Sequence, residues 1–151
     1  MRWLRILGHD TAYESHIEDE VLVRRCLVEG RVLLTRDRRL LEEWRIKRAL
    51  LISAEKPLEQ LREVVTRLGL DCSARLFLRC TLCNSLVEAA DRASVRGRVP
   101  DRIWQEQERF ARCTRCDRIY WEGSHTRRIR ARLEATIPEL RNPVRESGSL
   151  R

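Results

Sequence analysis

Two Cys-x-x-Cys pairs restrict the possible folds of this chain more than any other feature of its sequence. The first pair is Cys80 and Cys83, and the second is Cys113 and Cys116. Each such turn places two thiolates within reach of one ion, and two turns supply the four soft ligands that tetrahedral zinc prefers. The pairs therefore predict a structural Zn²⁺ module, closed by four cysteines and without an open position for catalysis. Two redox disulfides are the alternative interpretation.

The chain carries no recognisable export or membrane signal. Its first residues, MRWLRILGHD, lack the long apolar stretch and the small-residue cleavage site of a secretory signal. No segment approaches the roughly 18 apolar residues of a membrane span. These features predict a cytoplasmic protein without a membrane partner, and in that compartment paired cysteines favour metal over disulfides.

Residues 1–70 alternate between helical and strand-like segments. The strand-like segments are apolar without polar alternation, which is typical of a parallel sheet covered on both faces. Gly8, Gly30 and Gly69 are expected helix stops, and Pro57 an expected helix start. The pattern predicts helices at 2–7, 18–29, 40–46 and 57–68, and strands at 10–14, 31–35 and 49–53.

The composition changes after Gly69. Five of the six cysteines lie beyond this point, and a polar stretch with a predicted helix at 100–110 separates the two pairs. RIYWEG, after the second pair, is typical of a ribbon strand. From about residue 137 the chain is rich in proline and poor in apolar residues, which predicts disorder. The expected divisions are an α/β domain at 1–70, a zinc ribbon at 71–134 and a disordered basic tail at 135–151.

The chain is strongly basic. It has 31 Lys and Arg against 23 Asp and Glu, a formal net charge of +8, and most of the basic residues are arginine. Arginine makes forked contacts to phosphate, so we expect RNA as a partner. A solvated arginine-rich surface, core packing of the aromatic residues and a capping or surface role for the histidine remain open alternatives. The candidate RNA contacts are Arg36, Arg118, Trp121, His125, Arg127 and Arg128.

Acidic residues follow or flank the predicted strands. Asp37 comes directly after the strand at 31–35, and Glu18, Asp19 and Glu20 begin the helix at 18–29. Ligands of open α/β sheets gather at the carboxyl ends of the strands, and Asp19 shares a helix face with apolar residues, so we expect its carboxylate to point inward. Clustered carboxylates would suit Mg²⁺ or Mn²⁺, which could activate water at a scissile phosphate. Helix capping is the alternative role.

Seven segments between Arg2 and about Ile129 carry a family resemblance. They are RWLRILGHDT, EDEVL, EGRVLLTRDRRLL, EQLREVVTRLGL, RCTLCN, VRGRVPDRIW and RCTRCDRIYWEGSHTRRI. In combination they resemble the Mut7-C ribonuclease family, a branch of PIN-like nucleases with a C-terminal zinc ribbon.

The resemblance implies a PIN-like parallel sheet followed by a small zinc-ribbon module, with cleavage of RNA that depends on a divalent metal. It implies that Asp19 and Asp37 are catalytic metal ligands, with Glu18 and Glu20 as weaker neighbours. The four paired cysteines would hold the ribbon zinc.

One departure from the family pattern concerns the N-terminus. The family normally begins with a strand that ends in an aspartate, just before the helix that here is RWLRIL. We therefore expect an N-terminally incomplete sheet, caused by a start codon placed too late or by genuine loss of the strand. A partner chain or a second copy could complete the sheet. The alternative function is a noncatalytic RNA-binding zinc-ribbon protein that lacks the first-strand aspartate.

Overall fold

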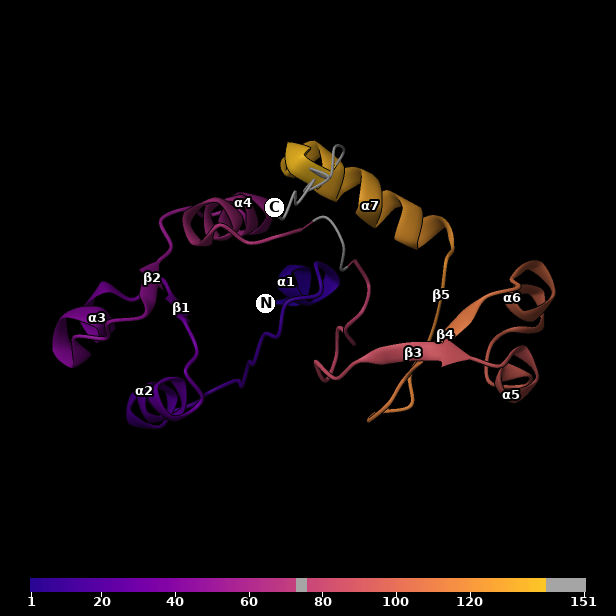
Figure 1. Ribbon diagram of the computed structural model, residues 1–151, viewed down its shortest axis with the longest axis horizontal. Coiled ribbons are helices and arrows are strands. Elements are labelled where there is room, and N and C mark those ends of the chain that lie inside the picture. Colours follow the sequence, from indigo (N-terminus) through magenta and orange to yellow (C-terminus); the bar gives the residue numbers. More distant parts are fainter. Residues whose placement is uncertain (73–75, 141–151) are drawn as a thin grey trace, which may run out of the picture. The chain divides into compact units, whose positions relative to one another are not determined.

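The computed structural model describes residues 1–72 and 76–140 (Figure 1). It divides into two compact units: Tyr13–Leu70, and Met1–Ala12 together with the part that begins at Asp71. The sequence-based division placed residues 1–12 with the segments that follow them, whereas in the structure they group with the part that bears the cysteine pairs. No helix in the described part of the chain is long and apolar enough to cross a membrane.

The unit Tyr13–Leu70 holds a small parallel sheet with helices between and beside its strands. Strands β1 and β2 run parallel, with Leu34 opposite Leu50. One cluster of its core consists of Val23, Cys26, Leu33 and Leu40. In chain order the elements are α2 (Asp19–Val28), β1 (Leu33–Thr35), α3 (Arg38–Trp44), β2 (Ala49–Leu51) and α4 (Pro57–Leu68).

Helix α4 begins and ends where the sequence predicts. Pro57 occupies the first turn, where its fixed φ suits the helix and its missing N–H is not needed. Gly69 follows the last turn with φ 58° and ψ 41°, in the left-handed region that glycine enters without a Cβ clash. Leu61, Val64 and Val65 form the buried face of this helix.

The second unit is built on an antiparallel sheet of order β3–β4–β5. Phe110 in β4 lies opposite Ala90 in β3 and Trp121 in β5, and it belongs to a core cluster with Val95 and Val99. The elements are α1 (Arg2–Ile6), β3 (Val87–Ala90), α5 (Arg92–Val95), α6 (Asp101–Glu106), β4 (Phe110–Cys113), β5 (Ile119–Trp121), α7 (Ser124–Thr136) and the 3₁₀ helix η1 (Pro138–Leu140).

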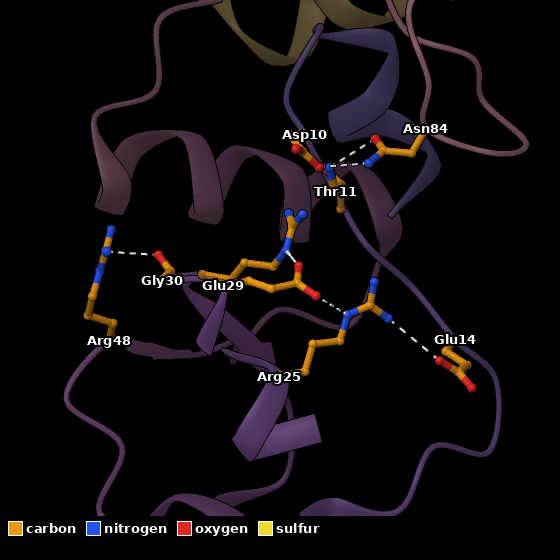
Figure 2. Close-up of polar contacts among 9 residues, drawn as sticks. Asp10, Thr11, Glu14, Arg25, Glu29, Gly30, Arg48 and Asn84 are labelled. Carbon is orange, nitrogen blue, oxygen red and sulfur yellow. Dashed lines mark hydrogen bonds and ion pairs between the residues drawn. The ribbon is translucent and has the colours of Figure 1, made fainter. Parts of the chain in front are cut away.

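The strand predicted at 10–14 is wrong. The N–H of Thr11 donates to the side-chain oxygen of Asn84 at 3.0 Å, and the carbonyl of Thr11 accepts from Arg5 at 2.9 Å. Side chains, and not a neighbouring strand, therefore satisfy the backbone of Thr11. Figure 2 shows Asn84 bridging Asp10 and Thr11.

Several other boundaries also differ from expectation, two of them by more than a turn of helix. The helix predicted at 100–110 ends at Glu106, because Gln107 is extended and Phe110 already belongs to β4. Of the tail predicted to be disordered from residue 135, residues 135–136 lie in α7 and Pro138–Leu140 form η1. Buried Leu133 and Ile137 anchor this end of the helix. Residues 141–151 lie outside the described part of the chain.

Candidate functional site

The four paired cysteines converge on one point. Their sulfurs all lie within 4.8 Å of one another. Cys80 Sγ is 3.5 Å from Cys116 Sγ, and Cys83 Sγ is 3.4 Å from Cys113 Sγ. A disulfide needs an S–S distance of about 2.05 Å, whereas a tetrahedron of roughly 2.3 Å zinc–sulfur bonds gives sulfur separations of ~3.8 Å. The arrangement fits a structural metal such as zinc.

The backbone of the first pair forms a compact knuckle. The N–H of Asn84 donates to the Cys80 carbonyl at 3.0 Å, and the N–H of Cys80 donates to the Ser85 carbonyl at 2.8 Å. The N–H of Cys83 points at Cys80 Sγ at 3.4 Å. Asn84 has φ 70°, a left-handed conformation that asparagine tolerates better than most residues. A backbone donor thus faces the sulfur of Cys80.

The second pair repeats the same arrangement. The N–H of Asp117 donates to the Cys113 carbonyl at 3.1 Å, and the N–H of Cys113 donates to the Arg118 carbonyl at 2.9 Å. The N–H of Cys116 faces Cys113 Sγ at 3.5 Å, and Asp117 has φ 60°. In both knuckles the first cysteine is buried and the second is more accessible. The two halves are therefore equivalent ligand pairs.

Hydrogen bonds favour the thiolate form of the first pair. Burial raises the pKa of Cys80, but donors that include the Cys83 N–H and the Tyr120 hydroxyl outweigh it, so this pKa lies below its ordinary value. The hydroxyl is 3.0 Å from Cys80 Sγ. Burial also opposes ionisation of Cys83, but the backbone and hydroxyl of Ser85 lead the contacts that lower its pKa to about 6.

The fourth cysteine, Cys116, has a raised thiol pKa. The Arg118 N–H lowers the pKa of Cys116, but burial and the three neighbouring sulfurs together raise it to about 12. Burial, followed by the bond to Cys80, likewise raises the pKa of Tyr120 to about 12. Four negative sulfurs at this spacing need a divalent ion between them.

The N-terminal segment holds the first knuckle from outside. Arg5 is 4% exposed, and its guanidinium donates to the carbonyls of Thr81 at 3.2 Å and Leu82 at 2.7 Å. Asn84 donates to Asp10 at 2.7 Å (Figure 2). These contacts supply the second ring of hydrogen bonds that usually orients metal ligands. Nothing in the local sequence around the cysteines points to Arg5.

The acidic residues predicted to bind Mg²⁺ or Mn²⁺ lie on the surface of the other unit. Asp37 caps α3: its Oδ1 accepts from the N–H groups of Arg39 at 2.8 Å and Leu40 at 3.3 Å. Asp19 is exposed at the start of α2, and does not point inward as we expected. Glu18 and Glu20 are also exposed. Within the described residues, the four cysteines are the one group of three or more potential ligands brought together.

A carboxylate that sequence reasoning missed lies beyond the end of β2. Glu63 of α4 accepts from the N–H and hydroxyl of Ser53 and from the N–H of Ala54, each at 3.0 Å at its shortest. Arg67 donates to it at 3.0 Å. The Ala54 N–H, followed by that of Ser53, leads the contacts that lower the pKa of Glu63 to about 2. This residue ties β2 to α4.

Comparison with known families decides what kind of chain this is. The model of the Mut7-C RNAse domain matches residues 1–133. The chain belongs to the Mut7-C RNase domain family. This confirms the resemblance seen in the sequence, and the match spans both units, including the four cysteines, Asp19 and Asp37. No curated protein and no solved structure matches the chain.

The predicted RNA contacts of this Mut7-C chain fall into distinct settings. Arg118, His125, Arg127 and Arg128 are exposed, the last three on α7. Arg36 is exposed beside Asp37 in the other unit. Trp121 is half-buried and packs against the core cluster around Phe110, the setting of a core residue.

Proposed function

We propose that this chain is a divalent-metal-dependent ribonuclease that hydrolyses phosphodiester bonds in RNA. The observation that carries the proposal is the match of a family described as an RNase domain to residues 1–133. A PIN-like fold over residues 1–70 belongs to the same proposal. It is supported by the alternating helix and strand order of the unit Tyr13–Leu70 and by its parallel strand pair.

Asp37 and Asp19 are the proposed ligands of Mg²⁺ or Mn²⁺, with Glu18 and Glu20 beside them. Asp37 follows the carboxyl end of β1, the edge where ligands of such sheets gather. Both of its capping bonds end on Oδ1, so Oδ2 is left to face a cation. The bound ion would supply a water of lowered pKa and neutralise charge on the phosphate.

Basic residues of both units are the proposed RNA contacts. Four of them are exposed in the cysteine-bearing unit: Arg118, His125, Arg127 and Arg128. The fifth, Arg36, is exposed beside Asp37 in the other unit. Zinc held by the four cysteines would fix the shape of that unit without entering the reaction. A partner chain or second copy could add a strand beside β1, which within the described residues pairs with β2 alone.

A second candidate is a noncatalytic RNA-binding protein. It is favoured by one observation: Asp37 already acts as a helix cap, and the acidic residues near it are exposed and not gathered with it into a ligand group in the described part of the chain. In this case the basic surface would bind RNA and the zinc module would be a scaffold.

Cleavage of RNA by the zinc-loaded chain with Mn²⁺ separates the two candidates. Asp37→Asn and Asp37→Ser both keep an oxygen that can cap α3, so they remove the carboxylate charge while preserving the helix start. The ribonuclease proposal predicts that both variants lose at least about 100-fold in rate, because a metal ligand is gone. Glu43→Gln, an exposed acid on the same helix, serves as the matched control and should cleave normally. RNA binding without any metal-dependent cleavage would establish the second candidate.

A further inference from the structure

A groove of about 500 Å³ opens in the unit Tyr13–Leu70, away from the acidic edge. It is lined by the segments that lead into the two strands, Gly30–Arg31 before β1 and residues 44–48 before β2. Asp37, in contrast, follows the other end of β1. One strand of three residues, ~10 Å in length, therefore separates the groove from the proposed metal edge.

The lining of the groove combines apolar and cationic groups and contains no acid. Val23 and Cys26 form a buried floor, 3% and 7% exposed, while Trp44 is 38% exposed. A volume of this size falls within the range of about 300–1,000 Å³ that is usual for ligand pockets. Four cations surround the floor: Arg31, Arg45, Lys47 and Arg48.

Two of these cations are engaged and two are available. Arg48 donates to the carbonyl of Gly30 at 2.8 Å, and Glu29 binds Arg25 (Figure 2). Arg31 pairs with the same Glu29. In the described part of the chain, Arg45 and Lys47 form no ion pair. The engaged cations fix the shape of the rim, and the other two keep their charge for an anion.

The backbone of Arg45 is held in an unfavourable conformation. This residue ends α3 with φ 44° and ψ 47°, the left-handed region where helices usually place glycine. Glycine would adopt this turn without a Cβ clash. The arginine therefore adds a cation to the rim at a conformational cost.

We propose that this groove binds single-stranded RNA, with Trp44 stacking on one base and with Arg45 and Lys47 contacting the adjoining phosphates. Stacking on an exposed aromatic ring beside cations is the usual way in which proteins hold unpaired nucleotides. The inference rests on the proposed function for the identity of the polymer. It adds that the strand is unpaired and that it crosses the unit from the acidic edge to the opposite ends of the strands.

An acidic peptide is the competing ligand, and the indole ring argues against it. Carboxylates would use the cations alone, whereas a base uses both the ring and the charges. The two ligands therefore differ in their dependence on Trp44. An RNA strand without bases carries the same phosphates and isolates the contribution of stacking.

Anisotropy of a labelled single strand, with the zinc-loaded full chain and without Mn²⁺, tests the groove. Trp44→Ala should weaken binding of the single strand about 5- to 160-fold, the range of one lost stacking contact, and leave binding of the abasic strand within about twofold. Arg45→Gly should weaken binding of both the intact and the abasic strand. It should not lower the midpoint of thermal unfolding, because glycine suits the turn. Loss of affinity then cannot be ascribed to unfolding.

A charge-matched control separates the groove from general attraction. Arg45→Gly with Lys47→Gln should reduce the salt slope of binding by about 1.4, or roughly 0.7 for each lost phosphate contact. Arg24→Gln with Lys56→Gln removes the same charge from exposed positions of the same unit outside the groove, and should change affinity less than about twofold.

Three results would overturn the assignment. The first is RNA binding by Trp44→Ala that equals that of the wild type, and the second is an equal loss of RNA affinity in the two double variants. The third is displacement of the labelled RNA by polyglutamate as effectively as by unlabelled RNA. Failure of the proposed ribonuclease function gives a different result: no Mn²⁺-dependent cleavage would be observed, while the Trp44-dependent binding of RNA would remain.

Discussion

Arg5 shows how one side chain can support a metal site from a distance. A buried guanidinium is costly unless its donors are satisfied, and here they meet the carbonyls of Thr11, Thr81 and Leu82. Two of those carbonyls belong to the turn between Cys80 and Cys83. The positive charge also lies next to a centre that would carry a net negative charge with four thiolates and one Zn²⁺.

Replacement of Arg5 by methionine should weaken this unit and its hold on zinc. Methionine fills similar space but leaves buried carbonyls without donors, so we expect a loss of about 2–4 kcal/mol in the free energy of unfolding. Urea titration measures the loss, and competition with a chromogenic chelator reports the parallel fall in zinc affinity. Arg2→Met makes the same change at an exposed position of the same helix. Equal effects of the two variants would show that Arg5 has no special role.

At the residue scale, the spacing of the cysteines was enough to predict the metal ligands, but not the residues that hydrogen-bond to the turns around them. Cys80, Cys83, Cys113 and Cys116 could be predicted because two residues between cysteines set the distance between their sulfurs. Two of the three partners of Arg5 are 76 and 77 positions away in sequence, and no local pattern encodes such a contact. Asn84 and Asp117, which follow the two cysteine pairs, can be read from the sequence. Because asparagine and aspartate tolerate positive φ, they could have predicted the two knuckles.

The connection between β2 and α4 depends on the ionised form of Glu63. Its side chain is 14% exposed and accepts from backbone donors just beyond β2. The pKa of Glu63 is lowered from 4.5 to about 2 in the folded state. A carboxyl with a depressed pKa stabilises the fold above its unfolded pKa and loses that contribution as the pH falls through its folded pKa.

Glu63→Gln should therefore destabilise the chain in a pH-dependent way. The difference between wild type and variant in urea midpoint is expected to be complete at pH 6, to shrink below pH 4.5 and to vanish near pH 2. Glu59→Gln alters an exposed acid of the same helix, and its difference in urea midpoint from wild type should depend much less on pH. A Glu63 difference that stays constant from pH 6 to pH 2 would contradict this account.

Elements with their own start and stop residues were predicted well. Helix α4 has Pro57 and Gly69 at its ends, and both act locally. The strand expected at 10–14 failed because the side chains of Arg5 and Asn84 take the backbone hydrogen bonds of Thr11. Helix α6 is shorter than expected because Phe110 is recruited into β4 and the core beneath it. Tertiary contacts thus override the local pattern at both places.

The division of the molecule into units has a consequence for metal removal. All four sulfur ligands lie in the unit formed by Met1–Ala12 and the part from Asp71 onward, and none lies in Tyr13–Leu70. Chelation of zinc should therefore raise amide exchange throughout β3, β4 and β5 and in residues 2–11. It should leave exchange in α2, α3 and α4 unchanged.

Hydrogen exchange with mass spectrometry, before and after chelation, measures this selectivity. Cys83→Ser provides the genetic equivalent, and Cys26→Ser is its control because Cys26 belongs to the core of the other unit. Equal loss of protection in both units would show that they fold as one cooperative block.

The pairing of the N-terminal segment with a knuckle more than seventy residues later also sets an order of events during synthesis. Residues 1–12 leave the ribosome before Tyr13–Leu70, yet their partners Thr81, Leu82 and Asn84 emerge only after the whole of that unit. At about 5–20 residues per second, that interval lasts several seconds. The unit Tyr13–Leu70 can therefore fold before residues 1–12 reach the partners that hold them in the folded chain.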